Sequence, residues 1–331
     1  MKFGAVPIAD ALGALLAHSV PLTEGRMRKG LVLAQPDIAK LRAAGITIVT
    51  VATLDADDVT EDTAATRLAQ ALVPGDQGLT LTDAFTGRVN LKAMGPGIVA
   101  LDADAIHALN RVHPAITLAT LPGHARVVAG SLVGTVKIIS YAVPEAALQQ
   151  AVATAHAAIR VLPVVRRTAG LLLTEVPGQD GKLAAKGKRA VEARLRALGM
   201  SLADVVVVPH EARAMSAALT CLKGDILLLL TGSATSDLHD TGPEAVRLAG
   251  GQVARFGMPV DPGNLLFHGA LGSRPVIGLP GCARSPALNG ADWVLERYAC
   301  GLDVSDDDIA AMGVGGLLKE IALRGHLREQ D

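Results

Sequence analysis

Aromatic residues are scarce in this chain: four Phe, two Tyr and one Trp make up 2% of it, although 50% of its residues are hydrophobic. The core must therefore be built from Ala, Val, Leu and Ile. A chain of 331 residues suggests two domains, and it is long enough to bury such a core without a disulfide or a structural metal.

Paired cysteines, a basic excess and long apolar runs are also missing. Cys221, Cys282 and Cys300 show no CxxC spacing, which argues against a zinc site or a disulfide framework and favours a reducing cytoplasm. The formal net charge is −1, so nucleic acid is not an expected partner. No uncharged apolar run of about 18 residues occurs and no leader pattern opens the chain, so neither a membrane span nor a signal peptide is expected.

Two patterns of secondary structure divide the chain. Residues 1–163 predict a smaller, strand-rich α+β domain. In residues 164–302 strands alternate with helices, which predicts an α/β domain of three layers around a mostly parallel sheet. The boundary is expected within Leu162–Arg167, and residues 303–331 are expected to form a C-terminal tail.

Some predictions in the first domain are specific enough to check. Helices are predicted over Ile8–Ala17 and Pro144–Val161. A third helix, over Thr63–Leu72, follows a group of acids whose simple interpretation is compensation of the helix dipole, with a metal site as the alternative. These acids are Asp55, Asp57, Asp58, Glu61 and Asp62.

The run Ile226–Leu230 is apolar without alternation, as expected for a strand buried on both faces of a parallel sheet. It ends in the small and hydroxylated segment 231–236, and open α/β sheets bind ligands at such carboxyl ends. Asp237 and Asp240 follow, before a helix. Helix N–H groups favour an anion and carboxylates favour a metal ion, so a polyanion carried with Mg²⁺ satisfies both. The alternative is an ordinary strand–turn–helix connection with Asp240 as N-cap.

Two later loops rich in Gly and Pro follow in order: DPGN at 261–264, before FHG at 267–269, and LPGCARS at 279–285. Together with TGSATSDLHD at 231–240, they resemble the molybdopterin-binding domain of molybdenum cofactor biosynthesis, whose patterns are GGxSxGxxD, PGKPxxFG and LPGNPVS. The family includes the molybdopterin molybdotransferases and the gephyrin E domain. The chain is also similar to the molybdopterin-binding half of proteins fused to a molybdenum cofactor nucleotidyltransferase.

The resemblance implies roles for the matched residues. Asp240, Asp237, Asp225 and Glu175 would be catalytic carboxylates, and Asp240 and Asp237 would hold Mg²⁺. The residues that would cradle the pterin and its phosphate are Thr231, Gly232, Ser233, Ala234, Thr235, Ser236, Pro262, Gly263, Asn264, Gly281, Cys282, Arg284 and Ser285.

The chain also departs from the family patterns. Asn264 stands where the family has a lysine, and Cys282 and Ala283 replace an asparagine and a proline. Each charge-assisted hydrogen bond lost with a cation beside a phosphate is worth about 1.5–3 kcal/mol. Arg284, Lys182, Lys186 and Lys188 are the cations that could compensate.

Two functions remain open. The first is an Mg²⁺-dependent transferase that inserts molybdate into molybdopterin or its adenylylated form. The second is a non-catalytic protein that binds the pterin and delivers it to a separate nucleotidyltransferase. In both cases the resemblance implies a homodimer, and the cysteine pattern favours the cytoplasm.

Overall fold

The computed structural model describes residues 1–178 and 181–318. The chain divides into two compact units, which consist of Met1–Gly95 with Val99–Val161, and of Pro96–Ile98 with Leu162–Asp331. No helix within the described ranges has both the length and the apolar composition that crossing a membrane requires.

The first unit begins with a small module that has its own core. Its sheet has the order β1-β5-β2, with bounds Lys2–Pro7, Ile48–Thr53 and Leu15–Leu16, and α1 (Gln35–Ala43) packs on it. A hairpin of β3 (Val20–Pro21) and β4 (Arg26–Met27) completes the module. The prediction of a helix over Ile8–Ala17 is wrong. Only the 3-10 turn Ile8–Asp10 forms, and the N–H of Leu16 then donates to the carbonyl of Leu31 because strand pairing replaces helix bonds there.

The rest of this unit packs three helices on three small sheets. Its sheets have the orders β10-β12-β8-β7, β11-β9-β14 and β13-β6. The helices are α2 (Glu61–Leu72), α3 (Ala103–Val112) and α4 (Glu145–Thr154). The strands are β6 (Asp58–Thr60), β7 (Leu79–Leu81), β8 (Arg88–Ala93), β9 (Gly97–Leu101), β10 (Ile116–Thr120), β11 (Arg126–Val127), β12 (Leu132–Ile138), β13 (Ala142–Pro144) and β14 (Ile159–Pro163). The helix predicted to reach Val161 ends at Thr154, because the chain reverses at Ala157 (φ 58°) into β14.

Several of the acids around the start of α2 have structural partners. Asp62 accepts a 2.6 Å hydrogen bond from the N–H of Gly87, and Asp55 and Asp58 lie 2.6 and 2.8 Å from the Met1 amino group. In the described part of the chain, no three His, Cys, Asp or Glu side chains form a group that could hold a metal ion. Glu61 and Asp62 lie in the first turn of α2, which is where the dipole interpretation places acids, and that interpretation stays a prediction.

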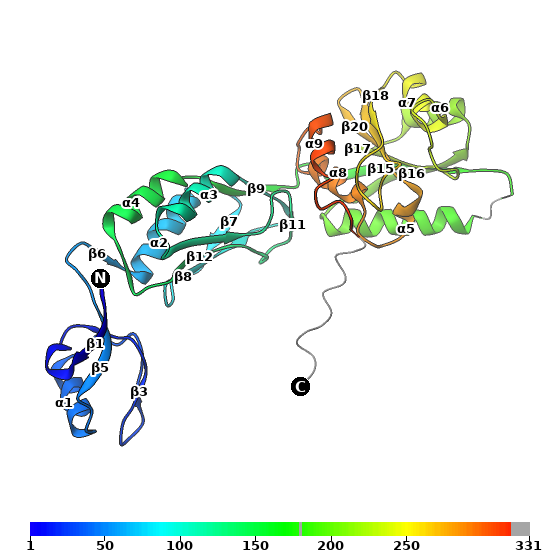
Figure 1. The fold of residues 1–331 in the computed structure, drawn as a ribbon. Helices are drawn as coiled ribbons and strands as arrows, with labels where there is room; N and C mark the ends of the chain where they lie inside the picture. The colour runs from blue at the N-terminus through cyan, green and yellow to red at the C-terminus, as the bar shows by residue number, and fades with distance from the viewer. Residues whose placement is uncertain (179–180, 319–331) are drawn as a thin grey trace. The chain divides into compact units, whose positions relative to one another are not determined.

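The second unit is an α/β unit built on a six-stranded mixed sheet with the order β16-β15-β17-β20-β19-β18 (Figure 1). β15 pairs in parallel with β16 and β17, and β17 with β20, whereas β19 runs antiparallel to both β20 and β18. The strands are β15 (Thr168–Glu175), β16 (Ser201–Pro209), β17 (Ile226–Leu230), β18 (Gln252–Phe256), β19 (Phe267–Leu271) and β20 (Arg274–Gly278).

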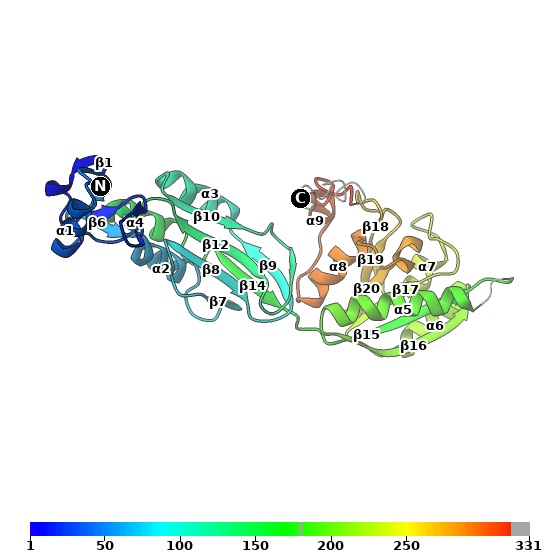
Figure 2. The same cartoon turned by 90° about the horizontal axis from the view of Figure 1, so that it is seen from below.

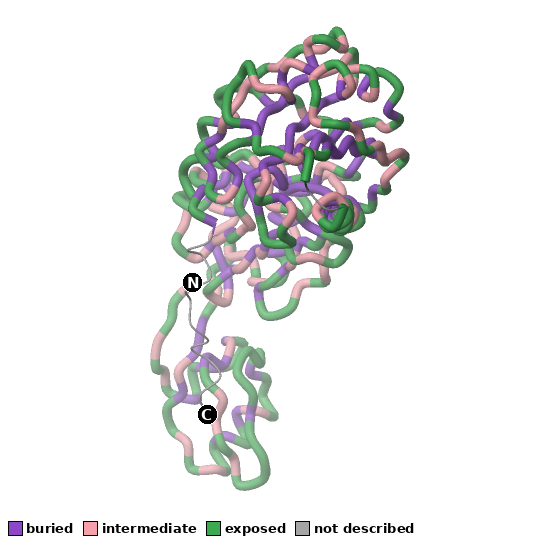
Figure 3. Tube along the Cα trace, turned by 90° about the vertical axis from the view of Figure 1, so that its right-hand side faces the viewer, coloured by how far each residue is buried: buried purple, intermediate pink, exposed green. Residues whose placement is uncertain are grey.

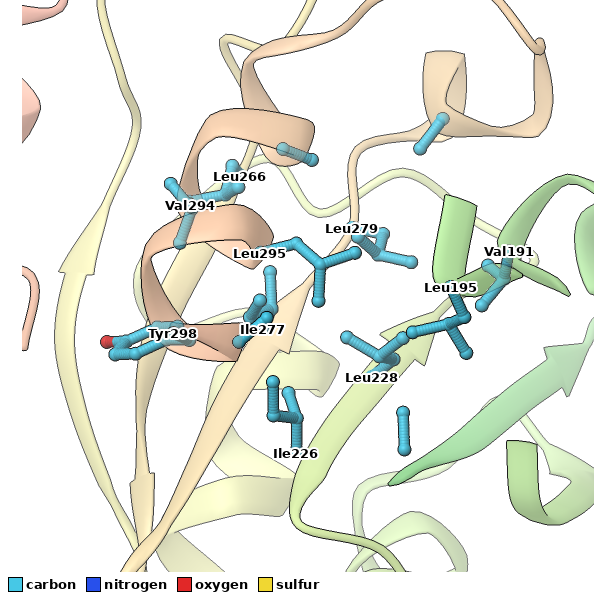
Figure 4. Packing of buried hydrophobic residues seen from close by; sticks show 14 of the residues in the cluster. Val191, Leu195, Ile226, Leu228, Leu266, Ile277, Leu279, Val294, Leu295 and Tyr298 are labelled. Carbon is cyan, nitrogen blue, oxygen red and sulfur yellow. The ribbon is translucent and has the colours of Figure 1, made fainter. Parts of the chain in front are cut away.

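Helices cover both faces of this sheet (Figure 2). One face packs on α5 (Lys182–Ala197) and α8 (Gly290–Ala299), and the other on α6 (Ala212–Cys221) and α7 (Thr241–Leu248). All five residues of β17 are buried, and Figure 3 shows the buried segments of the chain in purple. Alternate β17 side chains enter opposite cores, and Figure 4 shows Ile226 and Leu228 among the side chains of α5 and α8.

The end of the described chain belongs to this unit. Ile309 lies on α9 (Asp306–Ala311). Ile309 and Met312 pack in the same hydrophobic core as α8. The part of the predicted tail that the structure describes is therefore folded onto the domain, while residues 319–331 lie outside the described residues.

The direction of β19 decides which loops share an edge. Phe267 begins β19 and pairs with Gly278, the last residue of β20. The β18–β19 connection therefore lies at the carboxyl edge of the parallel strands, beside the loops that follow β17 and β20.

Candidate functional site

Backbone and side-chain hydrogen bonds connect the three predicted loops at this edge. Arg284 Nη2, after β20, donates to the carbonyl of Thr231, after β17, at 2.6 Å. The N–H of Gly290 at the start of α8 donates to the carbonyl of Pro262, in the β18–β19 connection, at 2.8 Å. The structure thus brings the three segments together that the sequence pattern singled out.

The loop after β17 is hydrogen-bonded to the ends of the neighbouring strands on one side and exposed to solvent on the other. Gly232 N–H donates to Thr174 Oγ1 at 2.7 Å, and Thr174 Oγ1 also lies 3.0 Å from His210 Nδ1, so the ends of β15, β16 and β17 are tied together. Thr231 and Thr235 are buried. The predicted contact residues Ser233, Ala234 and Ser236 are exposed and face solvent.

Asp240 is the N-cap of α7. Its Oδ1 accepts from the N–H of Thr241 at 2.6 Å, and its Oδ2 accepts from the N–H and hydroxyl of Ser236 at 2.9 and 3.3 Å. Burial opposes ionisation of Asp240, but these hydrogen bonds outweigh it and hold its pKa below the ordinary 3.8. The N-cap alternative is therefore the structural role of Asp240, and the carboxylate that it leaves at the edge is ionised at neutral pH.

Asp237 is the second predicted metal ligand. It is exposed, and its Oδ1 accepts from the N–H of His239 at 2.8 Å. No group of three metal-ligating side chains forms among residues 1–178 and 181–318. Two carboxylates fit Mg²⁺ only as part of a coordination shell that water and the phosphate oxygens of a ligand complete, which is how Mg²⁺ is commonly held.

Arg284 is a half-buried cation without a counter-charge. Burial alone lowers the pKa of its guanidinium, and no carboxylate of the described residues pairs with it. Its Nε is buried without a hydrogen-bond partner, and Nη1 reaches only the carbonyl of Gly281, at 3.5 Å. An arginine keeps its charge in proteins, so Arg284 offers unused donors at the edge where the loops meet.

The β18–β19 connection contributes backbone more than side chains. Gly263 is buried with φ 147°, and a Cβ there would lie 2.9 Å from the N of Gly290, so only glycine fits this close approach. Asn264 is exposed, and its side-chain amide donates to the carbonyl of Met258 at 3.3 Å. Asn264 therefore stabilises its own loop and supplies no charge.

Glu175 ends β15 and lines a cleft of about 450 Å³ between the ends of β15 and β16. His210 and Glu211 line the same cleft. The cleft is connected to the glycine loop through the hydrogen bonds of Thr174. A carboxylate, an imidazole and apolar valine side chains in one cleft suit a flat heterocycle with polar edges.

Asp225 is the one predicted carboxylate that the structure does not bring to this edge. It precedes β17, and the N–H groups of Arg167 and Thr168 donate to it at 2.8 and 2.9 Å, which holds its pKa below the ordinary value. The five residues of β17 separate it from the loop by roughly 16 Å, at about 3.3 Å per residue. Asp225 therefore connects the start of β17 to the start of β15, and it is not part of the candidate site.

Arg194 is the residue that the sequence analysis missed. It lies on α5, is 8% exposed, and its Nε donates to Asp292 Oδ1 at 2.7 Å. The signal was present in the sequence, because Arg194 falls on the apolar stripe of the helix at the spacing of Gly187, Ala190 and Val191. A charged residue on that stripe predicts a buried partner.

The loop after β20 also carries Cys282, Gly281 and Ser285. Cys282 is exposed, and the buried Asn289 donates from Nδ2 to its Sγ at 3.0 Å. Ser285 is exposed, and its hydroxyl accepts from the N–H of Ala287 at 3.3 Å. These contacts give the loop a defined shape on the side that faces α8.

Comparison with known proteins gives three findings. A family model described as a domain of unknown function (DUF8806) matches residues 5–53, which is the small N-terminal module. No curated protein matches the chain. Among solved structures, the molybdopterin biosynthesis MoeA protein from Pyrococcus horikosii is 14% identical, with 91% of this chain and 76% of that chain covered and a TM-score of 0.32.

Two further solved structures give similar values. A molybdenum cofactor biosynthesis protein from Pyrococcus furiosus is 12% identical, with 90% of this chain and 61% of that chain covered and a TM-score of 0.22. A molybdopterin biosynthesis MoeA protein from Pyrococcus horikoshii OT3 is 10% identical, with 84% and 69% covered and a TM-score of 0.23. At these scores the similarities carry no argument about the reaction, which must come from the residues.

Proposed function

We propose that the second unit binds a phosphorylated pterin at its carboxyl edge and that the protein acts in molybdenum cofactor biosynthesis. The observation that supports this most directly is Arg284, a half-buried guanidinium with a buried unpartnered Nε and no paired carboxylate among the described residues. Guanidinium groups bind phosphate through two parallel hydrogen bonds. A phosphate beside Arg284 would supply both the counter-charge and the missing acceptor.

The pterin ring is assigned to the cleft beside Glu175. A pterin presents its 2-amino group and ring N3–H as two parallel donors, and one carboxylate accepts both. Glu175 is an exposed carboxylate in a cleft of about 450 Å³, within the size range of small-molecule sites. In this arrangement the ring lies at the ends of β15 and β16 and the phosphate beside the loops after β17 and β20.

Mg²⁺ is proposed to arrive with the phosphate. When bound, it would supply charge neutralisation of the phosphate oxygens. Asp240 is already ionised and held in place by Ser236 and Thr241, so it accepts a cation without reorganisation. Asp237 is exposed close to it in the same loop. This arrangement supports the transferase hypothesis, in which molybdate and molybdopterin or its adenylylated form are the substrates.

A specific observation also favours the non-catalytic alternative. Both oxygens of Asp240 already accept hydrogen bonds as part of the N-cap, and Asn264 stands where the family pattern has a lysine. Such a site retains the means to bind the pterin but has fewer free groups for a reaction. In that case the protein delivers the pterin to a separate nucleotidyltransferase.

Calorimetric titration tests the binding proposal with a phosphorylated pterin and with the same pterin without its phosphate. We expect tighter binding of the phosphorylated form, and a loss for Glu175→Gln with both ligands because that variant no longer presents a charged double acceptor. Equal affinity for both ligands would contradict the proposed phosphate site.

A turnover assay separates the two functions. Purified protein is incubated with adenylylated molybdopterin and molybdate, with and without Mg²⁺, and the products are identified by mass spectrometry. Mg²⁺-dependent product supports the transferase, and tight binding without product supports delivery. Light scattering of the same samples tests the proposed homodimer, and localisation of a tagged protein in cells tests its proposed cytoplasmic position.

A further inference from the structure

Arg194 uses every donor of its guanidinium on protein acceptors. Nε donates to Asp292 Oδ1 at 2.7 Å. Nη1 donates to the carbonyls of Ala283 at 2.8 Å and Ala190 at 3.3 Å. Nη2 donates to the carbonyls of Ser285 at 2.8 Å and Ala287 at 3.1 Å. An arginine has five N–H donors, so none is left for a ligand.

The acceptors of Arg194 are placed on either side of Arg284. Ala283 precedes Arg284 in the chain and Ser285 follows it, and both carbonyls point to the same buried guanidinium. The two arginines therefore differ in how far their donors are used. Arg194 is buried, paired and saturated, whereas Arg284 is half-buried, unpaired and has a free Nε.

The ion pair also anchors the start of α8. Asp292 accepts from Arg194 through Oδ1 and from the N–H of Asn289 through Oδ2, at 2.8 Å, within a capping box. Asn289 in turn donates to Cys282 Sγ. The same buried guanidinium thus fixes the loop after β20 at its middle and at its end.

We propose that Arg194 is the positioning residue of the anion site: it holds the carbonyls of Ala283 and Ser285, the residues before and after Arg284, and so presents the Arg284 guanidinium to a phosphate in one fixed position. The inference rests on the proposed function only in naming that phosphate as part of a pterin. Because the clamp acts through Arg284, its effect on binding depends on Arg284 being present.

The test replaces both members of the ion pair by apolar residues, as Arg194→Met with Asp292→Leu. Removing both charges avoids leaving either member of this ion pair buried without the other, so the unit is expected to stay folded. Folding is followed by the fluorescence of Trp293, the single tryptophan of the chain, which lies on α8. Affinity is measured by calorimetry with the phosphorylated pterin, and Arg196→Met, an exposed change on the same helix, is the matched control.

We expect the pair replacement to weaken binding about ten-fold or more, since a displaced Arg284 guanidinium loses a charge-assisted hydrogen bond to the phosphate and such a bond corresponds to about that factor in affinity. The same replacement in an Arg284→Met background is expected to cause no further loss, because interacting positions are not additive. Arg196→Met is expected to bind as the unaltered protein does. A structural role without positioning would instead give equal losses in both backgrounds.

A second readout reports the loop directly. Cys282 is exposed, Cys300 is buried with its pKa raised by burial to about 11, and Cys221→Ser removes the other exposed thiol. The rate at which a disulfide reagent modifies Cys282 is expected to rise when the clamp is removed. If the pair replacement does not fold, Arg194→Lys tests the same point, because lysine can meet Asp292 but cannot hold three loop carbonyls.

The outcomes separate the two proposals. Unchanged affinity in the pair replacement, while Arg284→Met binds weakly, overturns the positioning role of Arg194 and leaves the phosphate site standing. Full affinity in Arg284→Met refutes the phosphate site itself. In that event the presentation of Arg284 to a phosphate falls as well; a faster modification rate at Cys282 then supports only the clamp on the loop, and an unchanged rate overturns that too.

Discussion

Replacing Arg284 by methionine should separate ligand binding from stability. Arg284 donates to the carbonyls of Thr231 at 2.6 Å and Gly281 at 3.5 Å, and it forms no ion pair with a described carboxylate. Methionine removes one good hydrogen bond, worth about 1 kcal/mol, and it also removes a partly desolvated charge that nothing balances. These changes oppose each other, so the free energy of unfolding should change by no more than about 1 kcal/mol.

The effect on binding is expected to be much larger. Hydrogen bonds between a guanidinium and a phosphate are worth about 1.5–3 kcal/mol each. Since 1.4 kcal/mol is a factor of ten, losing even one lowers affinity for the phosphorylated pterin by about ten-fold to a hundred-fold. Affinity for the pterin without phosphate should not change, because Arg284 faces the phosphate end of the proposed site.

Arg274→Met provides the matched control. Arg274 begins β20, whereas Arg284 follows its end, and its Nη1 also donates to a backbone carbonyl, that of Leu222, at 2.6 Å. The control has the same change of charge and a similar lost hydrogen bond at the opposite edge of the sheet. We measure binding by calorimetry and stability by urea unfolding followed at Trp293. Equal loss of affinity in both variants, or none in Arg284→Met, would refute the assignment of the phosphate.

Three further predictions concern stability and are measured by denaturant unfolding followed at Trp293. Asp240→Ala should lose about 1 kcal/mol of unfolding free energy at pH 7 through the missing N-cap. Because the pKa of Asp240 is lowered in the folded protein, the unaltered protein loses this contribution as the pH falls below 3.8. A difference in stability between the two proteins that stayed constant down to about pH 2 would contradict the argument. His268 is buried and its pKa is lowered by burial, with the Tyr298 hydroxyl, Arg255 and Asp306 around it. The neutral imidazole therefore contributes fully to stability above pH 6.5, and this contribution falls as the pH is lowered, by no more than about 1.4 kcal/mol per pH unit. His268→Gln should flatten the plot of unfolding free energy against pH in that acidic range. Gly278→Ala should cost about 1–3 kcal/mol, because its Cβ would lie 1.9 Å from the buried ring of Phe267. A loss clearly below about 1 kcal/mol would show that the ring moves freely.

Patterns that depend on neighbours in the chain were predictable from the sequence. The uniform apolar run Ile226–Leu230 has the bounds of β17, and burial on both faces is the reason for its composition. The glycine-rich loops after it follow from local backbone demands, as Gly263 illustrates with its φ of 147°, a conformation that side chains rarely adopt. The predicted helix over Ile8–Ala17 failed because pairing with Leu31, a distant residue, outweighed local propensity.

The site was only partly predictable, for the same reason. The pattern identified the loops that hold Ser233, Asp240 and Arg284, but it grouped Asp225 with them, although that carboxylate lies at the other edge of the sheet. Sequence order gives the residues that follow a strand, whereas the edge at which a residue lies depends on whether it begins or ends that strand.

The sequence by itself determined the α/β character of the second unit, its central strand and the composition of three loops, because each depends on residues close together in the chain. Only the tertiary structure decided which charges are paired. Arg194 meets Asp292 across 98 positions of sequence, whereas Arg284 meets no described carboxylate. Pairing depends on which side chains are buried together, and burial is a property of the packed sheet and helices that no local pattern contains.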